Sequence, residues 1–197
     1  NVAITSGTGA TTFGASGSIA SGGGNVTLTS NVAKLLGNID TTGGASTGNF
    51  TIAGTGVISQ AATTALKIKG TTTLGAGAGN NVTLANTGND FTGAVSVATG
   101  NNVSITDANA LVLGASTVSG TLAVNAGGSV TQTGAVNAAQ LTAALTGAAS
   151  ALNLGTQTNN IAQLNAITAP GGFTLTNGNN AVAINGVISS TNNSVAI

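Results

Sequence analysis

Short alternating segments recur along the whole chain and constrain its fold more than any other feature. Each has two apolar residues separated by a small or polar one, as in NVAI at residue 1, NFTI at 49 and NVTL at 81. A period of two is typical of a β-strand that buries one face. Clusters of Gly, Asn, Ser and Thr separate the segments, as turns do. The sequence therefore predicts an all-β protein. The further segments begin at residues 25, 65, 94, 102, 110, 121, 151, 172, 181 and 194.

One stretch, AVNAAQLTAALTGAASAL at 135–152, can also be written as a helix. Its apolar residues, among them Val136, Leu141 and Leu145, fit helical spacing only loosely. We therefore interpret the stretch as further strand and turn.

The chain also has a longer internal repeat, each copy of which contains several of the short segments. FTIAGTGVISQ (50–60) aligns with LAVNAGGSVTQ (122–132) at an offset of 72, so Gln60 aligns with Gln132. VTLANTGNDFTGAVSV (82–97) aligns without gaps with LNLGTQTNNIAQLNAI (152–167) at an offset of 70. Self-similarity at such a period is typical of repeat architectures.

These matches predict one repeat domain over residues 1–197. We divide it into superrepeats at 1–48 (partial), 49–120 and 121–197. Upstream, the segments at 25 and 35 match those at 102 and 112 at an offset of 77, and short insertions between strands explain the drift.

The predicted fold is a right-handed parallel β-helix, or β-solenoid, with coils of about 20 residues. The segments at Phe50, Leu66, Val82, Val103 and Leu122 follow one another at steps of 16, 16, 21 and 19, which we read as coil steps. Parallel crossover connections are overwhelmingly right-handed. A β-sandwich is the competing fold, but it offers no reason for so long an internal match.

The composition restricts the partners of the chain. Only 3% of the 197 residues are charged, against about 25% in ordinary globular proteins, and the formal net charge is zero. Nucleic acid and anionic membranes both attract basic clusters, so neither is an expected partner. No apolar run approaches the roughly 18 residues needed to cross a bilayer. The absence of Cys excludes disulfides and thiolate metal sites.

The three carboxylates, Asp40, Asp90 and Asp107, are the only candidates for acid–base chemistry. In the internal repeat Asp90 aligns with Asn160 and Asp107 aligns with Asn177. An amide cannot replace a general acid, whereas it can replace a turn-forming aspartate. We therefore predict no catalytic residues and no enzyme activity.

We also predict no metal site and no cofactor, because three scattered acids supply too few hard oxygen ligands for calcium. The four Phe align with aliphatic residues where the repeat covers them, which indicates core filling. Lys67 and Lys69 flank Ile68 and are expected to point outward, where Lys discourages sideways pairing of sheets. An anion site at these two lysines is the alternative.

Five Asn-x-Ser/Thr sequons begin at Asn25, Asn49, Asn81, Asn102 and Asn192. Four of them open a predicted strand, at the turn-to-strand boundary where Asn is favoured for local hydrogen bonds. That role explains them without modification, and glycosylation is the alternative.

TTTLGAGAGNNVTLANTGNDF (71–91) and NNVSITDANALVLGASTVSGTLAVNAGGSVTQTG (101–134) resemble the repeats of filamentous haemagglutinin-like proteins. These are large bacterial surface adhesins secreted by the two-partner route or as autotransporters. The resemblance covers nearly all of the chain, most clearly 49–197. It implies a right-handed β-helical shaft on the outer surface of a Gram-negative cell. The amino-terminal secretion domain of the family is not evident in this sequence.

The function we expect is a structural and adhesive β-helical shaft segment of a large exported bacterial surface protein. The alternative is a self-assembling extracellular filament or sheath subunit that stacks end to end, since neither end of the chain shows a polar cap. Expected partners are neighbouring coils or copies of the same array and a host-cell or matrix surface. No nucleic acid and no membrane insertion are expected, and the expected location is extracellular, on the bacterial outer surface.

Overall fold

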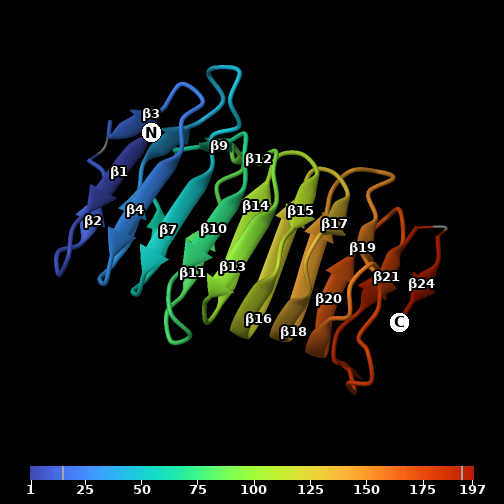
Figure 1. Ribbon diagram of the computed structural model, residues 1–197. Helices are drawn as coiled ribbons and strands as arrows, with labels where there is room; N and C mark the ends of the chain where they lie inside the picture. The colour runs from blue at the N-terminus through green and yellow to red at the C-terminus, as the bar shows by residue number, and fades with distance from the viewer. Residues whose placement is uncertain (15, 192) are drawn as a thin grey trace.

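The computed structural model describes residues 1–14, 16–191 and 193–197, and over these residues it contains only strands, turns and loops. The backbone winds into a β-solenoid of about 9 turns, with about 22 residues in each turn. Figure 1 shows the strands side by side along a rod, with the two termini at opposite ends. The all-β class and the parallel solenoid predicted from the sequence are confirmed. The described part of the chain holds no helix of the length and apolarity that a membrane crossing requires.

Two ten-stranded parallel sheets and one shorter sheet form the walls of the solenoid. Sheet A runs the full length of the rod. Its strands, in spatial order, are β1 (Val2–Thr5), β4 (Val26–Ser30), β7 (Phe50–Gly54), β10 (Thr72–Gly75), β13 (Val95–Thr99), β15 (Leu111–Leu113), β17 (Val130–Gln132), β19 (Leu152–Leu154), β21 (Phe173–Leu175) and β24 (Val195–Ala196).

Sheet B runs beside sheet A, and sheet C covers only the N-terminal half. The strands of sheet B are β2 (Thr11–Thr12), β5 (Lys34–Leu36), β8 (Ile58–Gln60), β11 (Val82–Leu84), β14 (Val103–Asp107), β16 (Ser116–Ala126), β18 (Val136–Leu145), β20 (Asn160–Thr168) and β22 (Ala183–Ile184), with β23 (Ile188–Ser189) also paired to β20. Those of sheet C are β3 (Ser18–Ala20), β6 (Asn38–Asp40), β9 (Leu66–Ile68) and β12 (Asp90–Phe91).

The cross-section of the coil changes along the rod. As far as β12, the chain visits sheets A, B and C in turn. From β13 to β22 it alternates between sheets A and B, and strands β16, β18 and β20 lengthen to 11, 10 and 9 residues. The stretch 135–152 forms β18, a loop and the start of β19, which confirms its interpretation as strand and turn.

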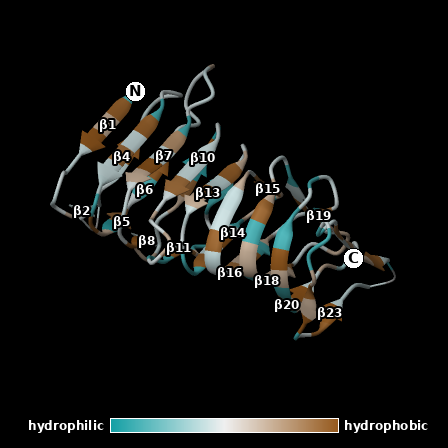
Figure 2. Cartoon of the chain, turned by 60° about the horizontal axis from the view of Figure 1, so that its bottom comes forward, coloured by the Kyte–Doolittle hydropathy of each residue, from teal (hydrophilic) through white to brown (hydrophobic). Residues whose placement is uncertain are grey.

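Aliphatic side chains stack in register between the sheets and form the core. In sheet B the inward ladder places each residue directly beside its partner in the next coil, and every member is at most 1% exposed. This ladder consists of Ile58, Val82, Val103, Leu122, Leu141 and Leu164. Burying such a side chain is worth about 1.5–3 kcal/mol. Figure 2 shows the brown apolar segments on the strands and paler, more polar loops between them.

Three Phe residues, Phe50, Phe91 and Phe173, belong to the same core, and their exposed fractions are 0–1%. Phe13 is partly buried and packs against it. The prediction that the Phe residues fill the core is confirmed.

The superrepeat and the sheets are out of phase. Phe50 lies on sheet A, whereas the aligned Leu122 lies on sheet B. The two equal steps from Phe50 through Leu66 to Val82 join strands on three different sheets, so their interpretation as coil steps is wrong. With about 22 residues in a coil, an offset of 72 corresponds to about three and a third coils and therefore ends on a different face.

Candidate functional site

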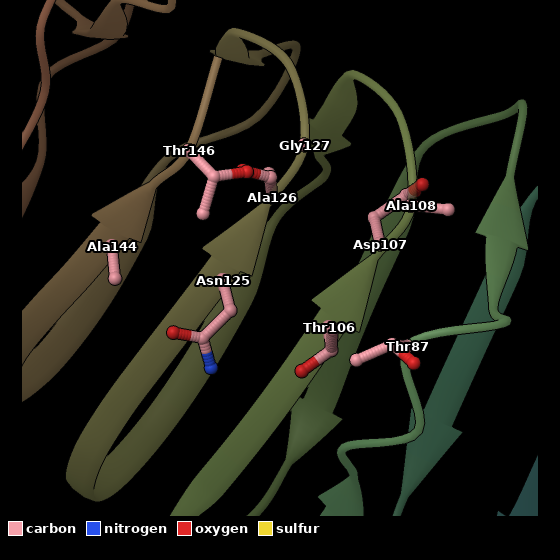
Figure 3. A pocket seen from close by; sticks show the side chains of 9 residues that line it. All are labelled: Thr87, Thr106, Asp107, Ala108, Asn125, Ala126, Gly127, Ala144 and Thr146. Carbon is pink, nitrogen blue, oxygen red and sulfur yellow. The ribbon is translucent and has the colours of Figure 1, made fainter.

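A shallow hollow lies on the outer side of sheet B, near the ends of β14, β16 and β18 (Figure 3). Thr106, Asn125 and Ala144 lie side by side there, because they are register partners on the three adjacent strands. Thr87 lines the hollow from a loop. These four side chains are small and uncharged, and those of Thr87, Thr106 and Asn125 offer hydrogen-bonding groups.

Asp107 is the one ionisable residue at this hollow, and its carboxylate is already bonded to the backbone. Asp107 is 2% exposed. Its Oδ2 accepts the N–H of Phe91 at 3.1 Å, and its Oδ1 accepts the N–H of Asn109 at 2.8 Å. Burial raises the pKa of Asp107, and these two N–H groups oppose the rise.

Asn177 takes the place of Asp107 in the second superrepeat. Its Oδ1 accepts the N–H of Ile161 at 2.8 Å, and Ile161 aligns with Phe91. Its Nδ2 donates to the Ile161 carbonyl at 2.9 Å. The alignment of Asp107 with Asn177 therefore corresponds to one shared corner, in which either side chain holds the same backbone N–H.

Each superrepeat also contains a reciprocal pair of side-chain amides, which we call the amide clasp. In the first clasp Gln60 Nε2 donates to Asn89 Oδ1 at 2.7 Å, and Asn89 Nδ2 donates back to Gln60 Oε1 at 3.0 Å. Asn89 also accepts the N–H of Leu66 at 3.0 Å and donates to the Leu84 carbonyl at 3.3 Å. Asn89 is fully buried.

The second clasp repeats these contacts with Gln132 and Asn159. Gln132 Nε2 donates to Asn159 Oδ1 at 2.8 Å, and Asn159 Nδ2 donates to Gln132 Oε1 at 3.2 Å. Asn159 accepts the N–H of Val136 at 2.9 Å and donates to the Leu154 carbonyl at 2.8 Å. The internal repeat aligns Gln60 with Gln132 and Asn89 with Asn159, but only the folded coil brings each Gln to its Asn partner.

The exposed charges of the chain gather in one place. Asp40, Lys67 and Asp90 are register partners on β6, β9 and β12, and we call them the charged column. Lys67 is exposed, and the two aspartates are half-buried. The sequence pattern did not predict that the fold brings Asp40, Lys67 and Asp90 together.

Lys69 lies next to the charged column, just after β9. Its Nζ donates to the Gly44 carbonyl at 2.7 Å. The outward position predicted for Lys67 and Lys69 is confirmed for Lys67, whereas Lys69 is half-buried. Asp40 Oδ1 accepts the Thr42 hydroxyl at 2.6 Å and the Thr42 N–H at 2.7 Å. These bonds, and to a smaller extent the Lys67 ammonium, lower the pKa of Asp40.

The equivalent column in the second superrepeat is uncharged. Thr117, Asn137 and Asn160 are register partners on β16, β18 and β20, and we call them the neutral column. All three are exposed. Asn137 and Asn160 align with Lys67 and Asp90 at an offset of 70, and each column lies directly beside a clasp.

The sequon asparagines form ladders between coils. The Oδ1 atoms of Asn25 and Asn49 accept the N–H groups of Asn49 and Thr71 at 2.9 and 2.8 Å. In a second ladder Asn81 Oδ1 accepts the N–H of Asn102 at 3.2 Å, and Asn102 Oδ1 accepts that of Thr121 at 3.0 Å. The local hydrogen bonds predicted for these residues are therefore replaced by bonds to the next coil. The fifth sequon, at Asn192, lies outside the described residues.

Lys34 is a buried cation that the sequence pattern did not predict. It occupies an inward position on β5, is 0% exposed, and donates from Nζ to the Thr55 carbonyl. Gly54 and Gly56, with φ of 103° and 99°, shape the turn that presents this carbonyl. Burial lowers the pKa of Lys34. Lys34 aligns with the buried Leu111 at the offset of 77, and this alignment could have predicted that Lys34 is buried.

Across the described residues, no three His, Cys, Asp or Glu side chains come together in a way that could hold a metal ion. The arrangement instead offers buried amides that fix the backbone and one small cluster of exposed charges.

Comparison with known proteins gives one family. The sequence profile of a family described as repeats of unknown function (DUF5649) matches residues 23–98 and again residues 100–168. No curated protein and no solved structure matches the chain. The two matched units begin at positions 23 and 100, whereas the two full predicted superrepeats begin at 49 and 121, and these boundaries stay a prediction.

Proposed function

The chain belongs to the family of repeats of unknown function (DUF5649), and on that premise we propose that it is a structural and adhesive shaft segment of a large exported bacterial surface protein. The observation that carries the proposal is the parallel stack, in which coils are hydrogen-bonded to their neighbours along sheets A and B. Such a stack gives a stiff rod, because each coil contacts only its neighbours and the stack extends by repetition.

The surface chemistry supports a spacer without catalytic activity. Asp107 and Asn177 hold equivalent backbone N–H groups, so the buried acid has a structural role that an amide also fills. The remaining acids, Asp40 and Asp90, flank Lys67, and Lys69 lies beside them. We propose that the chain is not an enzyme and needs no cofactor.

The resemblance to filamentous haemagglutinin-like proteins supports an adhesive role on the bacterial outer surface. In this proposal the rod contacts a host-cell or matrix surface along its length, or holds a binding tip away from the cell. Nucleic acid and membrane insertion have no part in it, because the chain has a net charge of zero and few basic residues.

The location is tested with antibodies against the chain applied to intact cells of the source organism. Labelling without permeabilisation is expected, whereas labelling only after permeabilisation would contradict export. Adhesion is tested by binding of the purified chain to matrix-coated surfaces. Polysaccharide hydrolysis and elimination assays are expected to show no turnover, and Asp90→Asn is expected to change nothing in them.

A second candidate is a filament subunit that stacks end to end. The specific observation in its favour is the apolar surface of the last coil, where Ile184, Val187 and Val195 are 58%, 76% and 45% exposed. A coil of another copy would cover these side chains and extend both long sheets. Negative-stain images over a range of concentrations separate the candidates, because a subunit gives longer fibres as concentration rises and a shaft segment gives single short rods.

A further inference from the structure

The charged column is the most distinctive feature of the rod surface. The chain has six ionisable Lys and Asp side chains. Two of them, Lys34 and Asp107, are buried. The other four are the charged column and the adjacent Lys69. A rod whose surface is otherwise neutral therefore carries its accessible side-chain charge on one short stretch of sheet C.

The order of the charges along the rod is negative, positive, negative. Register partners in adjacent parallel strands are about 4.8 Å apart, so Asp40 and Asp90 lie one coil on either side of Lys67. Within the described residues, neither the Lys67 ammonium nor the Asp90 carboxylate has a hydrogen-bonding partner, whereas Asp40 is bonded to Thr42. The column thus retains hydrogen-bonding capacity toward a molecule outside the coil.

The outward side chains beside the charged column are small, so they leave room for an opposing surface. The neighbouring outward positions hold Ser18, Asn38 and Ala65, all small, on β3, on β6 and just before β9. A shallow hollow lined by Asn38, Asp40, Ala65 and Lys67 lies between these positions and the charges. It has room for the end of a long side chain from an opposing surface.

We propose that the charged column is a docking surface for a second copy of this chain that lies antiparallel to the first. Closed pairs of identical chains have a two-fold axis. An axis along the rods makes them parallel and places each charge against its own copy, so all three contacts are repulsive. An axis across the rods, midway between Asp40 and Lys67, makes them antiparallel and places Asp40 against Lys67 of the second copy and Lys67 against Asp40. Charge complementarity therefore favours the antiparallel pair.

The pairing is weak for a single chain. The contact covers only four short strands, so we expect it to bury less than the roughly 1,000 Å² of a stable interface. Its affinity falls as salt rises, because exposed charges are screened over about 10 Å at 0.1 M ionic strength. This inference does not depend on the proposed surface location, since it concerns the isolated chain.

The first test is sedimentation equilibrium of the full chain at low and high salt. Lys67→Asp makes the column entirely negative, and the double change Asp40→Lys, Asp90→Lys makes it entirely positive. Each variant alone is expected to associate at least tenfold more weakly than wild type at low salt, and an equimolar mixture of the two is expected to associate again. The control is Asn137→Asp, which adds a negative charge in the neutral column and leaves self-association unchanged.

The second test reports the orientation of the pair. Ala20 is the register partner of Asp40 in the preceding coil and is exposed. In Ala20→Cys, the antiparallel pair keeps the two thiols about three coils apart, so the dimer seen at low salt is expected to stay reduced. A parallel pair brings them together and gives a disulfide-linked dimer, which would overturn the proposal. A monomeric wild type at every concentration and salt, with the fold intact by circular dichroism, would also overturn it.

Discussion

The charged column and the neutral column occupy equivalent places in the two superrepeats, yet each position holds a different residue type in the two columns. The clasps beside them keep the same Gln and Asn and the same backbone partners. Buried polar groups are costly when unpaired, so the clasps tolerate little change, whereas outward residues vary with little effect on folding. The comparison indicates that the clasps hold the coils in register and that the columns carry whatever surface properties differ between the repeats.

The largest effect is expected from breaking either clasp. Asn89→Ala and Asn159→Ala each remove the bonds of the Asn to a Gln side chain, a backbone N–H and a backbone carbonyl. The Gln then keeps one bond, from its Nε2 to a backbone carbonyl. We expect each to lower the free energy of unfolding by about 2–4 kcal/mol. Chemical denaturation measures the loss, and hydrogen exchange shows whether it stays near the altered coil.

The matched control is Asn137→Ala, because this exposed residue has no side-chain hydrogen bond among the described contacts. It is expected to change the stability by less than about 0.5 kcal/mol. If the losses in free energy of unfolding differ widely between Asn89→Ala and Asn159→Ala, the two clasps are not equivalent.

The next largest effect on stability is expected from exchanging Asp107 and Asn177, the aligned residues of the shared corner. Asn177→Asp places a carboxylate against the Ile161 carbonyl that the amide now donates to, and we expect a loss of about 1–3 kcal/mol at pH 7. The reverse change, Asp107→Asn, keeps an acceptor for the Phe91 N–H but leaves the Asn109 N–H without one, because an amide has a single oxygen. We expect it to cost about 1 kcal/mol.

The exchange also changes the pH dependence. The pKa of Asp107 is raised by folding, so the native state holds its proton after the unfolded chain has lost it near the ordinary value of 3.8. Stability from this group therefore falls as the pH rises from about 3.8 through the raised pKa. Unfolding measured from pH 3 to 7 should lose this slope in Asp107→Asn. An unchanged slope would show that another group produces it.

Lys34 offers a smaller test, because the aligned position in the second unit is Leu111. Lys34→Leu removes a buried amine, and we expect water to replace it at the carbonyl of Thr55, which is an exposed residue. We expect a gain on the order of 1 kcal/mol at pH 7. The lowered pKa of Lys34 means that wild-type stability rises with pH toward the ordinary value of 10.5, and the variant should lose this rise. A destabilised variant would show that the amine contributes more than it costs.

The smallest effect is expected at Thr72, which interrupts an inward ladder of sheet A between Phe50 and Val95. Its Oγ1 is buried without a hydrogen-bond partner among the described residues. Thr72→Val keeps the shape and removes the unpaired hydroxyl, so we expect a gain of about 0.5–1 kcal/mol. Thr73→Val on the outward side is the control, and its thermal unfolding should match wild type.

The sequence predicted the strands from the alternating pattern, which is local, and their parallel stacking from the internal repeat, which a solenoid requires and a sandwich does not. It did not predict which strands share a sheet, since corner lengths decide that and a superrepeat is not a whole number of coils. For the same reason the meeting of Asp40, Lys67 and Asp90 was missed. Asn89 and Asn159 were visible as aligned residues, but only the folded corner shows that they meet the two Gln.

The stacking of coils in parallel register is tested most directly with paired cysteines, because the chain has none of its own. Thr27 and Thr51 are register partners on β4 and β7, about 4.8 Å apart, within the Cα range of a disulfide. The pair Thr27→Cys, Thr51→Cys is expected to oxidise within one chain. The pair Thr27→Cys, Thr73→Cys, two coils apart, is expected to stay reduced at the same dilution. Oxidation of the second pair in preference to the first would contradict the solenoid.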